Sequence, residues 1–524
     1  MIGSKRASKA VSDKTADLLK RLERVAAGGG PEKAEVQKKA GKLLARERLE
    51  MLLDEDSFQE LDMLRESRCR DFGLSEKHLP ADGVVTGTGR IQGRTVCVFS
   101  QDFTVLGGTI GQAHAEKICK ILDLAITSGT PVIGLFDSGG ARIQEGVDAM
   151  GGYAEIFFRN VQASGRVPQI AAILGPCAGG AAFSPALADF VFMVKDMSHL
   201  FITGPGVIRE ATGEDTDLEA LGGTEAHSVR SGACHFVANS EQDCFRQIYD
   251  LMEYLPQNCM DAVREKRTDD DPKRESAVLD RIARLDTHQP YDIHEVIWEI
   301  ADDRNFLEVH KAFARNLVCG FSHFGGRVAG VVANNPKVRS GALDIDASEK
   351  GARFVRFCDA YDIPVVTLVD VPGYWPGMEQ EHGGIIRRGA KLLYAYCEAT
   401  VPKVTVVLKK AYGGAYDVMG SKHVRGDCNL AWPCAEISVM SAHGAVDILY
   451  AGELRKAASP DARREELSDE FMLHFSSPIL AAQRGYVDEV IEAKLTRPKI
   501  LRALQFLRHK KVDRVAKKHG NIPL

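Results

Sequence analysis

The chain has 524 residues, which is too long for one hydrophobic core, so it most simply forms two domains. Its 44% hydrophobic and 27% charged residues are typical of globular proteins, and 67 Lys and Arg against 72 Asp and Glu leave a net charge of only −5, which favours no nucleic-acid partner. We find no apolar run of 18 residues, so the sequence predicts no membrane span.

The first fifty residues are predicted to form amphipathic helices. Leu and Val recur at three- and four-residue spacing among charged residues in 15–25 and 33–54. The basic start MIGSKRASKA is similar to a transit peptide, but Asp13, Asp17 and Glu23 follow it, which favours an exposed first helix. With no charged-then-apolar leader either, we expect a cytoplasmic protein rather than a secreted or mitochondrial one.

Short β-branched runs then alternate with helix-like stretches, as in GVVTGTGRI from Gly83 and RTVCVFSQD from Arg94. This alternation is typical of an α/β layer fold with buried strands. Residues 256–290 are charged and contain prolines, so we place the domain boundary there, with domains at 1–270 and 271–524. The twelve cysteines are scattered without any C-x-x-C, so we expect neither disulfides nor a metal site.

The two halves of the chain repeat the same order of motifs. PVIGLFDSGG begins at Pro131 and PVVTLVDVPG at Pro364, an offset of 364 − 131 = 233. VPQIAAILGPCAGGAAF from Val167 matches VPKVTVVLKKAYGGAYDV from Val401 at 401 − 167 = 234. Because this register is kept over so many residues, we infer an internal duplication. Each half reads as strand, glycine-bearing turn, helix, strand, Gly-Gly turn and helix.

Both copies of the second motif contain a Gly-Gly-Ala step before a predicted helix. Such a step leaves backbone N–H groups unpaired at the positive end of the helix dipole, and glycine lets a bound carbonyl approach the backbone closely. Tight packing of helix on strand is the alternative explanation, but recurrence at the same repeat position favours two oxyanion holes. Their residues are Gly179, Gly180 and Ala181 in the first half and Gly413, Gly414 and Ala415 in the second.

Other motifs predict less. GTGRIQG from Gly87 is not the dinucleotide fingerprint, and no GKS or GKT phosphate loop exists. The G-x-C-x-G from Gly175 has the spacing of a hydrolase nucleophile elbow, but Ala411 stands where Cys177 would recur, which favours a small buried thiol. Three histidines near glycine-rich turns are interpreted as solvated or core residues rather than general bases: His199, His382 and His443.

Longer motifs carry a resemblance to a known family. They are DSGGARIQEG from Asp137, GPCAGGAAFSPALADF from Gly175, FITGPGVI from Phe201, LDIDASEKGARFVRFCDAYDIP from Leu343, PGYWPGMEQEHGGIIRRGAKLLYAY from Pro372, KAYGGAYDVMGSKH from Lys410 and the terminal KKHGNIPL. With these motifs the chain resembles the carboxyltransferase (β) subunit of biotin-dependent acyl-CoA carboxylases, with propionyl-CoA carboxylase as the nearest branch. The motifs span nearly the whole chain, which makes the resemblance more specific than any single one.

The resemblance implies an α/β fold of two crotonase-like (ClpP/crotonase superfamily) ββα-superhelix domains, assembled as a homohexamer. It also implies active sites formed between the N-terminal domain of one subunit, which takes acyl-CoA, and the C-terminal domain of another, which takes carboxybiotin. We find no AMKM-like biotin-attachment motif and no ATP-binding loop. Biotin is therefore expected on a separate biotin carboxylase or biotin carboxyl carrier subunit.

The same resemblance implies roles for individual residues. The Gly179-Gly180 step would hold the thioester enolate oxygen, and the Gly414-Ala415 step the ureido oxygen of biotin. Aspartate at position 417 matches members that prefer propionyl-CoA. Residues expected to set acyl specificity are Asp417, Tyr153 and Ile110; those expected to bind CoA are Gly139, Gly140, Ala141 and Arg142; those expected to bind biotin are Tyr374, Gly383, Gly384 and Ile385.

The expected activity is carboxyl transfer from carboxybiotin to the α-carbon of propionyl-CoA or a short relative, giving methylmalonyl-CoA. VLGGTIGQAH from Val105 departs from the GGS common in relatives, which leaves acyl specificity near Thr109 open. A transcarboxylase or a methylmalonyl-CoA decarboxylase would use the same half-reaction with another partner. A biotin-independent crotonase-type hydratase or thioesterase would need an acid or base beside Gly180, and a non-catalytic scaffold would need none of these groups.

Overall fold

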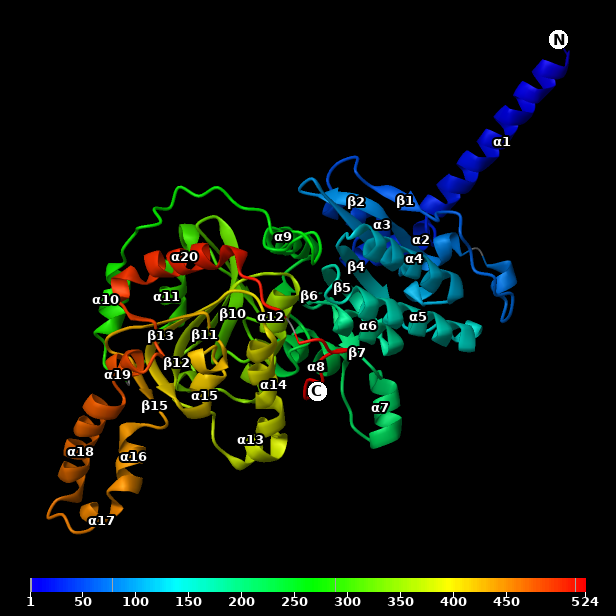
Figure 1. Ribbon diagram of the computed structural model, residues 1–524. Helices are drawn as coiled ribbons and strands as arrows, with labels where there is room; N and C mark the ends of the chain where they lie inside the picture. The colour runs from blue at the N-terminus through cyan, green and yellow to red at the C-terminus, as the bar shows by residue number, and fades with distance from the viewer. Residues whose placement is uncertain (1, 78, 288, 514) are drawn as a thin grey trace. The chain divides into compact units, whose positions relative to one another are not determined.

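The computed structural model describes residues 2–77, 79–287, 289–513 and 515–524, with side chains from residue 13 onward. The chain divides into two compact units, Met1–Asp261 and Ala262–Leu524 (Figure 1). This division lies inside the charged stretch 256–290, at 270 − 261 = 9 residues before the expected boundary. Each unit has its own sheet and its own hydrophobic core.

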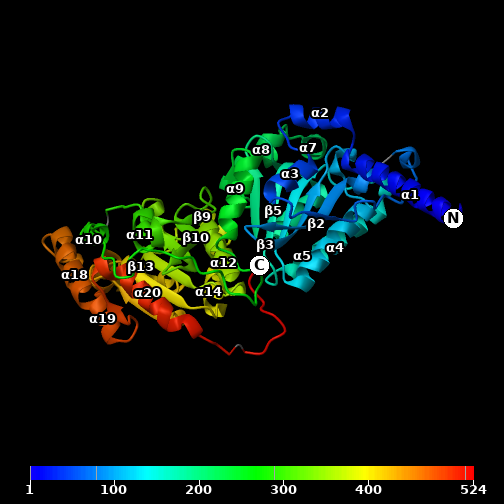
Figure 2. The same ribbon diagram turned by 90° about the horizontal axis from the view of Figure 1, so that it is seen from above.

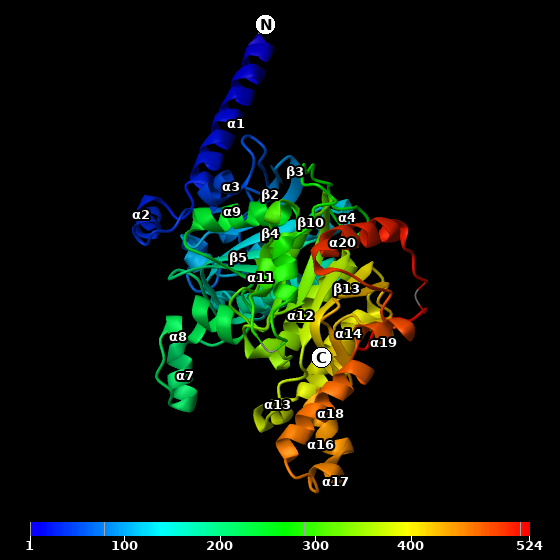
Figure 3. The same ribbon diagram turned by 90° about the vertical axis from the view of Figure 1, so that its left-hand side faces the viewer.

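The predicted N-terminal helices are confirmed. They are α1 (Ile2–Ala26), α2 (Pro31–Lys39) and α3 (Ala45–Leu52). Helix α1 extends away from the sheet of its unit (Figures 1 and 3). Helix α2 begins with a proline, whose missing N–H costs nothing in a first turn, and α3 buries Leu49 and Leu52 completely. The arm after α1 is therefore an integral part of the first unit.

The sheet of the first unit has the strand order β1-β2-β3-β4-β5-β6-β8. Strands β1 to β3 pair antiparallel, and the sheet is parallel from β3 onward, while β7 pairs only with the end of β5. The strands are β1 (Gln59–Leu61), β2 (Val84–Ile91), β3 (Arg94–Gln101), β4 (Val132–Ser138), β5 (Gln169–Ala178), β6 (Phe190–Val194), β7 (His199–Phe201) and β8 (Phe236–Ala238).

Two helices of the first unit run side by side, α4 (Gln112–Ser128) and α5 (Val147–Ala163) (Figure 2). Helix α4 buries Ile118, Ile121 and Leu122, which share one face at helical spacing. The core of the unit lies between such faces and the sheet. The remaining helices are α6 (Phe183–Leu187), α7 (Pro205–Thr212), α8 (Leu218–Gly222) and α9 (Glu241–Met252).

The second unit repeats this topology, which confirms the duplication. Its strand order is β16-β14-β13-β12-β11-β10-β9, with β15 pairing only with the end of β13, so each strand has a counterpart at the same place in the first sheet. The strands are β9 (Leu307–Val309), β10 (Leu317–Phe324), β11 (Arg327–Asn334), β12 (Val365–Val371), β13 (Lys403–Tyr412), β14 (Cys428–Ala431), β15 (Glu436–Ser438) and β16 (Glu489–Val490).

The helices that follow β15 differ from those that follow β7. Helices α16 (Ala442–Leu449), α17 (Ala451–Leu454) and α18 (Pro460–Phe475) project from the second sheet around a small core of their own (Figures 1 and 3). The others in this unit are α10 (Ala277–Ala283), α11 (Ile293–Ile300), α12 (Ile345–Ala360), α13 (Met378–Gly383), α14 (Ile385–Glu398), α15 (Gly413–Asp417), α19 (Pro478–Gln483) and α20 (Thr496–Phe506).

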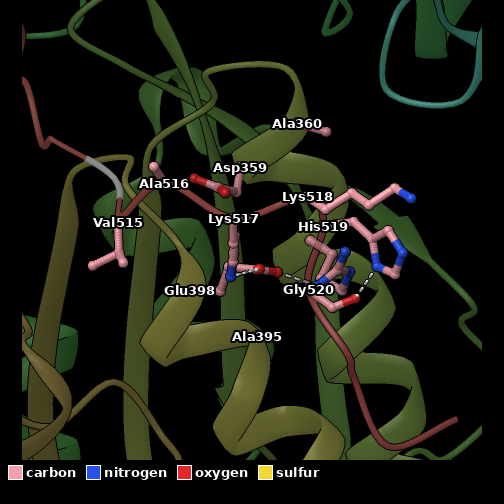
Figure 4. A pocket seen from close by; sticks show the side chains of 11 residues that line it. Asp359, Ala360, Ala395, Glu398, Val515, Ala516, Lys517, Lys518, His519 and Gly520 are labelled. Atoms are coloured by element: carbon pink, nitrogen blue, oxygen red, sulfur yellow. Dashed lines mark hydrogen bonds and ion pairs between the residues drawn. The ribbon is translucent and has the colours of Figure 1, made fainter.

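The C-terminal segment 515–520 packs back on α12 and α14. It closes a cavity of about 450 Å³, in which Lys517 Nζ lies 2.8 Å from Glu398 Oε1 (Figure 4). Within the described residues, no helix has a stretch both long and apolar enough to cross a lipid bilayer.

Candidate active site

In the first unit, strand β5 runs directly into a 3₁₀ turn, Gly179–Ala182, which continues as α6. Gly179 has φ +61°, a conformation that side chains other than glycine rarely adopt. As a first-turn residue, Gly180 has no intrahelical acceptor for its N–H group, and among the described residues this group donates to no other backbone carbonyl. The Ala181 N–H is the first donor of the 3₁₀ turn, whose i→i+3 pattern directs it to the carbonyl of Ala178. The turn therefore offers the free N–H donor of Gly180 at the positive end of a short helix.

The predicted specificity residue Tyr153 lies against this turn. A Cβ on Gly180 would stand 3.3 Å from the Tyr153 ring, so the glycine permits this contact. The ring is 5% exposed, burial raises the pKa of its hydroxyl, and that hydroxyl has no hydrogen-bond partner among the described residues. An unpaired buried hydroxyl is costly, so this one is a candidate for contact with a ligand.

Residues 139–142 form a tight loop beside the turn. Gly140 has φ +103°, and a Cβ there would lie 3.0 Å from the Ala178 carbonyl oxygen. The predicted residue Ile110 is joined to this loop through its backbone: its N–H donates to Gly140 O at 2.9 Å, and Ile110 and Ala141 pair as an isolated bridge. The Ile110 side chain is buried, so it can support this loop from the core but is not exposed to a ligand.

Arg142 does not fit its expected role in binding CoA phosphates. Its side chain is fully buried, and its Nη1 lies 2.5 Å from Asp82 Oδ1 and 2.8 Å from Glu145 Oε1. Its Nη2 donates to the Thr109 carbonyl at 2.8 Å. Its two terminal nitrogens are thus taken up by two carboxylates and a carbonyl, and its Nε, which has no partner among the described residues, is buried. The guanidinium fixes the loop and presents no exposed nitrogen to a phosphate.

In the second unit, strand β13 runs into α15, and Gly413 has φ +58°. A Cβ on Gly413 would meet Val439 O at 2.9 Å, whereas a Cβ on Gly414 would meet nothing within 4 Å. Neither Gly414 nor Ala415 donates its N–H to another described backbone carbonyl outside helix α15, and first-turn groups have no acceptor inside it. The sequence predicted a helix starting just after the glycines; in this unit the glycines form its first turn.

A pocket of about 460 Å³ opens above Gly413 and Gly414. It contains no carboxylate, histidine or thiol among its lining residues, and its donors include backbone N–H groups together with the side chains of Lys410, Tyr374 and Tyr412. The lining residues are Ser340, Pro372, Gly373, Tyr374, Lys410, Tyr412, Gly413, Gly414, Ala415, Val439, Met440 and Ser441. Sequence reasoning missed the segment 439–441, because nothing in its letters places the residues after β15 over the end of β13.

The predicted biotin-binding residues separate into two groups. Tyr374 lines this pocket, and burial raises the pKa of its hydroxyl to about 12. Gly383, Gly384 and Ile385 form the junction of α13 and α14, where Gly384 has φ +90° and Ile385 is buried. They are not among the residues that line the pocket.

Asp417 is the last residue of α15. Its carboxylate is about half exposed, with one oxygen 3.3 Å from His423 Nδ1. The adjacent Tyr416 is buried with an unpaired hydroxyl, as Tyr153 is in the first unit. Asp417 thus lies one helical turn from the free donors of Gly414 and Ala415, on the same short helix.

The rival candidates for side-chain catalysis are poorly placed. Cys177 is fully buried, its thiol contacts Ala181 O at 3.3 Å, and burial raises its pKa, so the reactive thiolate is disfavoured. His199 Nε2 lies 3.1 Å from Glu219, and the exposed His443 lies 3.3 Å from Glu465. His382 lies in the last turn of α13.

Comparison with known proteins agrees with this geometry. Residues 36–522 match the family model described as the carboxyl transferase domain. The chain is 52% identical over 514 residues to the propionyl-CoA carboxylase carboxyltransferase subunit of Haloferax mediterranei, covering 98% of this chain and 100% of that one. It is 53% identical over 499 residues to the mitochondrial propionyl-CoA carboxylase beta chain of Homo sapiens, covering 95% and 91%.

Among solved structures, transcarboxylase 12S, determined as a hexamer with hydrolysed methylmalonyl-coenzyme A bound, matches with a TM-score of 0.95 and 48% identity. The match covers 97% of this chain and 98% of that one. Full-length identity of this size, together with two intact glycine turns on duplicated sheets, places the chain in the carboxyl transferase domain family.

Proposed function

We propose that this chain is the carboxyltransferase component of a biotin-dependent propionyl-CoA carboxylase. It moves a carboxyl group from carboxybiotin, carried on a partner subunit, to the α-carbon of propionyl-CoA, which gives methylmalonyl-CoA. The observation that carries the proposal is the presence of one open glycine turn in each unit, with a free N–H donor at Gly180 in the first and at Gly414 and Ala415 in the second. The identities of the relatives from Haloferax and from human support the substrate.

In this proposal each turn neutralises charge on a different partner of the reaction. The N–H groups around Gly180 bind the thioester oxygen, where negative charge grows as the α-proton leaves. Those of Gly414 and Ala415 bind the ureido oxygen of biotin. One donor of this kind contributes about 2.7–4 kcal/mol to transition-state stabilisation. Holding the two large reactants in contact lowers the activation barrier further, through proximity.

The second-unit pocket fits the ureido ring of biotin. Gly414 faces open space, where a side chain would occupy the room that the ring needs. The lining is free of carboxylates, which would repel an oxyanion. Carboxybiotin, when bound, supplies both the carboxyl group and the base, so the chain itself has only to orient the partners and stabilise charge.

The partner and the assembly belong to the same proposal. The chain acts with a biotin-bearing subunit, since no biotin-attachment motif occurs in it, and it assembles as a homohexamer in the cytoplasm. The hexamer assembly of transcarboxylase 12S, similar along the whole chain, supports this. That structure also favours a second candidate function, the carboxyltransferase of a transcarboxylase. Co-purification from the native cell separates the two: a biotin carboxylase subunit supports the first, and a second carboxyltransferase supports the other.

The direct test is exchange of the carboxyl group between methylmalonyl-CoA and free biotin by the purified chain. We expect biotin-dependent loss of methylmalonyl-CoA with stoichiometric formation of propionyl-CoA. Absence of exchange with any short malonyl-type thioester would refute the proposal. Hydration of crotonyl-CoA without biotin would instead support a hydratase, which would need a side-chain acid or base beside Gly180.

A further inference from the structure

A buried aspartate stands at a break in strand register in each unit. Asp137 and Asp370 occupy the same repeat position, 370 − 137 = 233, and neither has any exposed surface. The register breaks on both sides of Asp137: Phe136 pairs with Ile173, but Ser138 pairs with Cys177. It breaks in the same way around Asp370, between the pairs Val369↔Val407 and Val371↔Ala411.

The break inserts extra chain just before each glycine turn. Between the two pairs, β4 advances by 138 − 136 = 2 residues and β5 by 177 − 173 = 4. The same count holds for β12 and β13, 371 − 369 = 2 against 411 − 407 = 4. Such a bulge bends its strand and leaves local backbone groups without ladder partners. The contacts that hold the bulge in place therefore determine the orientation of the glycine turn, which follows a few residues later.

In the first unit the N-terminal arm holds the bulge. Lys42 Nζ lies 2.7 Å from both carboxylate oxygens of Asp137, and Arg48 Nη1 lies 2.9 Å from one of them. Arg48 Nη2 also donates to the carbonyl of Leu174, inside the bulge, at 2.9 Å. At Gly175 a Cβ would lie 2.1 Å from the Asp137 carboxylate and 2.6 Å from Lys42 Nζ, so the ion pair fills the space of the missing side chain.

In the second unit the bulge supplies its own cation. The Lys410 N–H donates to Asp370 Oδ1 at 3.2 Å, and its Nζ lies 3.3 Å from the same oxygen. The Tyr291 hydroxyl donates to the other oxygen at 3.0 Å. Pro176 occupies the position in the first unit that Lys410 occupies in the second, at an offset of 410 − 176 = 234. Proline has neither an N–H nor a positive charge. The first unit therefore needs an outside cation, which Lys42 and Arg48 provide.

We propose that these carboxylate–cation pairs are positioning residues for the two oxyanion turns. Through Lys42 and Arg48, the N-terminal arm holds in place the turn that binds acyl-CoA. The inference rests on the proposed function for what each turn binds. From Pro176 to Gly179 the chain advances about 10 Å at roughly 3.3 Å per residue. A displacement of about 1 Å at a catalytic group can cost of the order of 10²-fold in rate.

Stability alone is a weaker explanation for these pairs. Replacing a buried ion pair by apolar side chains of similar volume is often neutral or stabilising, so burial of charge does not by itself favour folding. The cations here contact the bulge itself: Lys42 fills the space beside Gly175, and Arg48 binds the Leu174 carbonyl. The same carboxylate recurs in both units with cations of different origin, which points to the bulge as the feature being kept.

The test uses three variants of the full-length hexamer, Lys42→Met, Asp137→Asn and Asp370→Asn, in the exchange of methylmalonyl-CoA with free biotin. We expect turnover to become about 10- to 100-fold slower in all three, because each misplaces one turn. KM for the thioester should rise only in the first two, and KM for biotin only in the third. Lys42→Arg keeps the charge and should retain most of the activity.

Hydrogen exchange measured by mass spectrometry gives a readout that does not depend on activity. In Lys42→Met, amides of 176–187 should exchange faster, while those of 410–418 keep the wild-type rate; Asp370→Asn should show the reverse. Equal loosening of both segments, or a loss of turnover that only follows the loss of folded hexamer, would overturn the inference. If the wild-type chain exchanges no carboxyl group, the proposed function fails, and the hydrogen-exchange comparison still decides whether the pairs position the turns.

Discussion

A valine at position 414 tests the second turn directly. Gly414 is exposed, its φ lies outside the left-handed region, and a Cβ there would meet nothing within 4 Å, so the fold accepts Gly414→Val. We expect the free energy of unfolding to change by no more than about 0.5 kcal/mol, as for most exposed substitutions. The isopropyl group would instead fill the pocket of about 460 Å³ at the point where the N–H donors open.

Losing one such donor costs about 2.7–4 kcal/mol, so turnover should become roughly a hundred to a thousand times slower. The assay is carboxyl exchange between methylmalonyl-CoA and free biotin, with thioester affinity measured separately by calorimetry, and that affinity should stay unchanged. Gly452→Val is the matched control, because Gly452 is also an exposed helical glycine with open space around it, and it does not line the pocket. Near-wild-type turnover by Gly414→Val would refute the assignment of this turn.

Single substitutions at four other residues have distinct expected outcomes. Asp417→Ile should shift the preference among acetyl-, propionyl- and butyryl-CoA, and an unchanged ratio of kcat/KM values would remove Asp417 from substrate selection. Cys177→Ala should keep turnover within about twofold of wild type, because its buried, protonated thiol is no nucleophile, whereas loss of activity in a folded variant would revive the elbow hypothesis. Tyr153→Phe removes an unpaired buried hydroxyl and should leave stability equal or higher in a urea titration; slower turnover together with this result would identify a ligand contact. Arg142→Met should lower the unfolding free energy by about 3–5 kcal/mol, because it leaves two buried carboxylates uncompensated, and normal stability with a raised KM for CoA would restore the expected phosphate contact.

The repeat made most of the architecture predictable. A constant offset of 233–234 residues, with apolar runs before each Gly-Gly step, indicated two related α/β units and two turns at strand ends. The structure contains both units with the same strand order, and in each unit the glycines open the first turn of a helix. These features depend on local pattern and on backbone conformations that favour glycine, which a sequence displays directly.

Contacts between distant residues were not predictable in this way. The family resemblance suggested that Arg142 binds CoA, but its partner Asp82 lies 60 residues earlier. Lys42 looked like one charge among many in a helical arm, although it is paired with a carboxylate 95 residues away. Ion pairs between residues far apart in sequence do not show in any periodic pattern, so only the folded chain reveals that these two cations are paired with carboxylates.

The two strands that carry the glycine turns each change neighbour along their length. Strand β5 pairs first with β6 and then with β7, and β13 pairs first with β14 and then with β15. The peptide that follows β7 or β15 can therefore be rebuilt without disturbing the main sheet. At this place the first unit has α7 and α8 and the second has α16 to α18, while the strand order beneath is the same in both. The two related units therefore differ mainly at the edge of the sheet, beside the glycine turns, and a difference at that place lets each unit bind a different ligand on a sheet of the same topology.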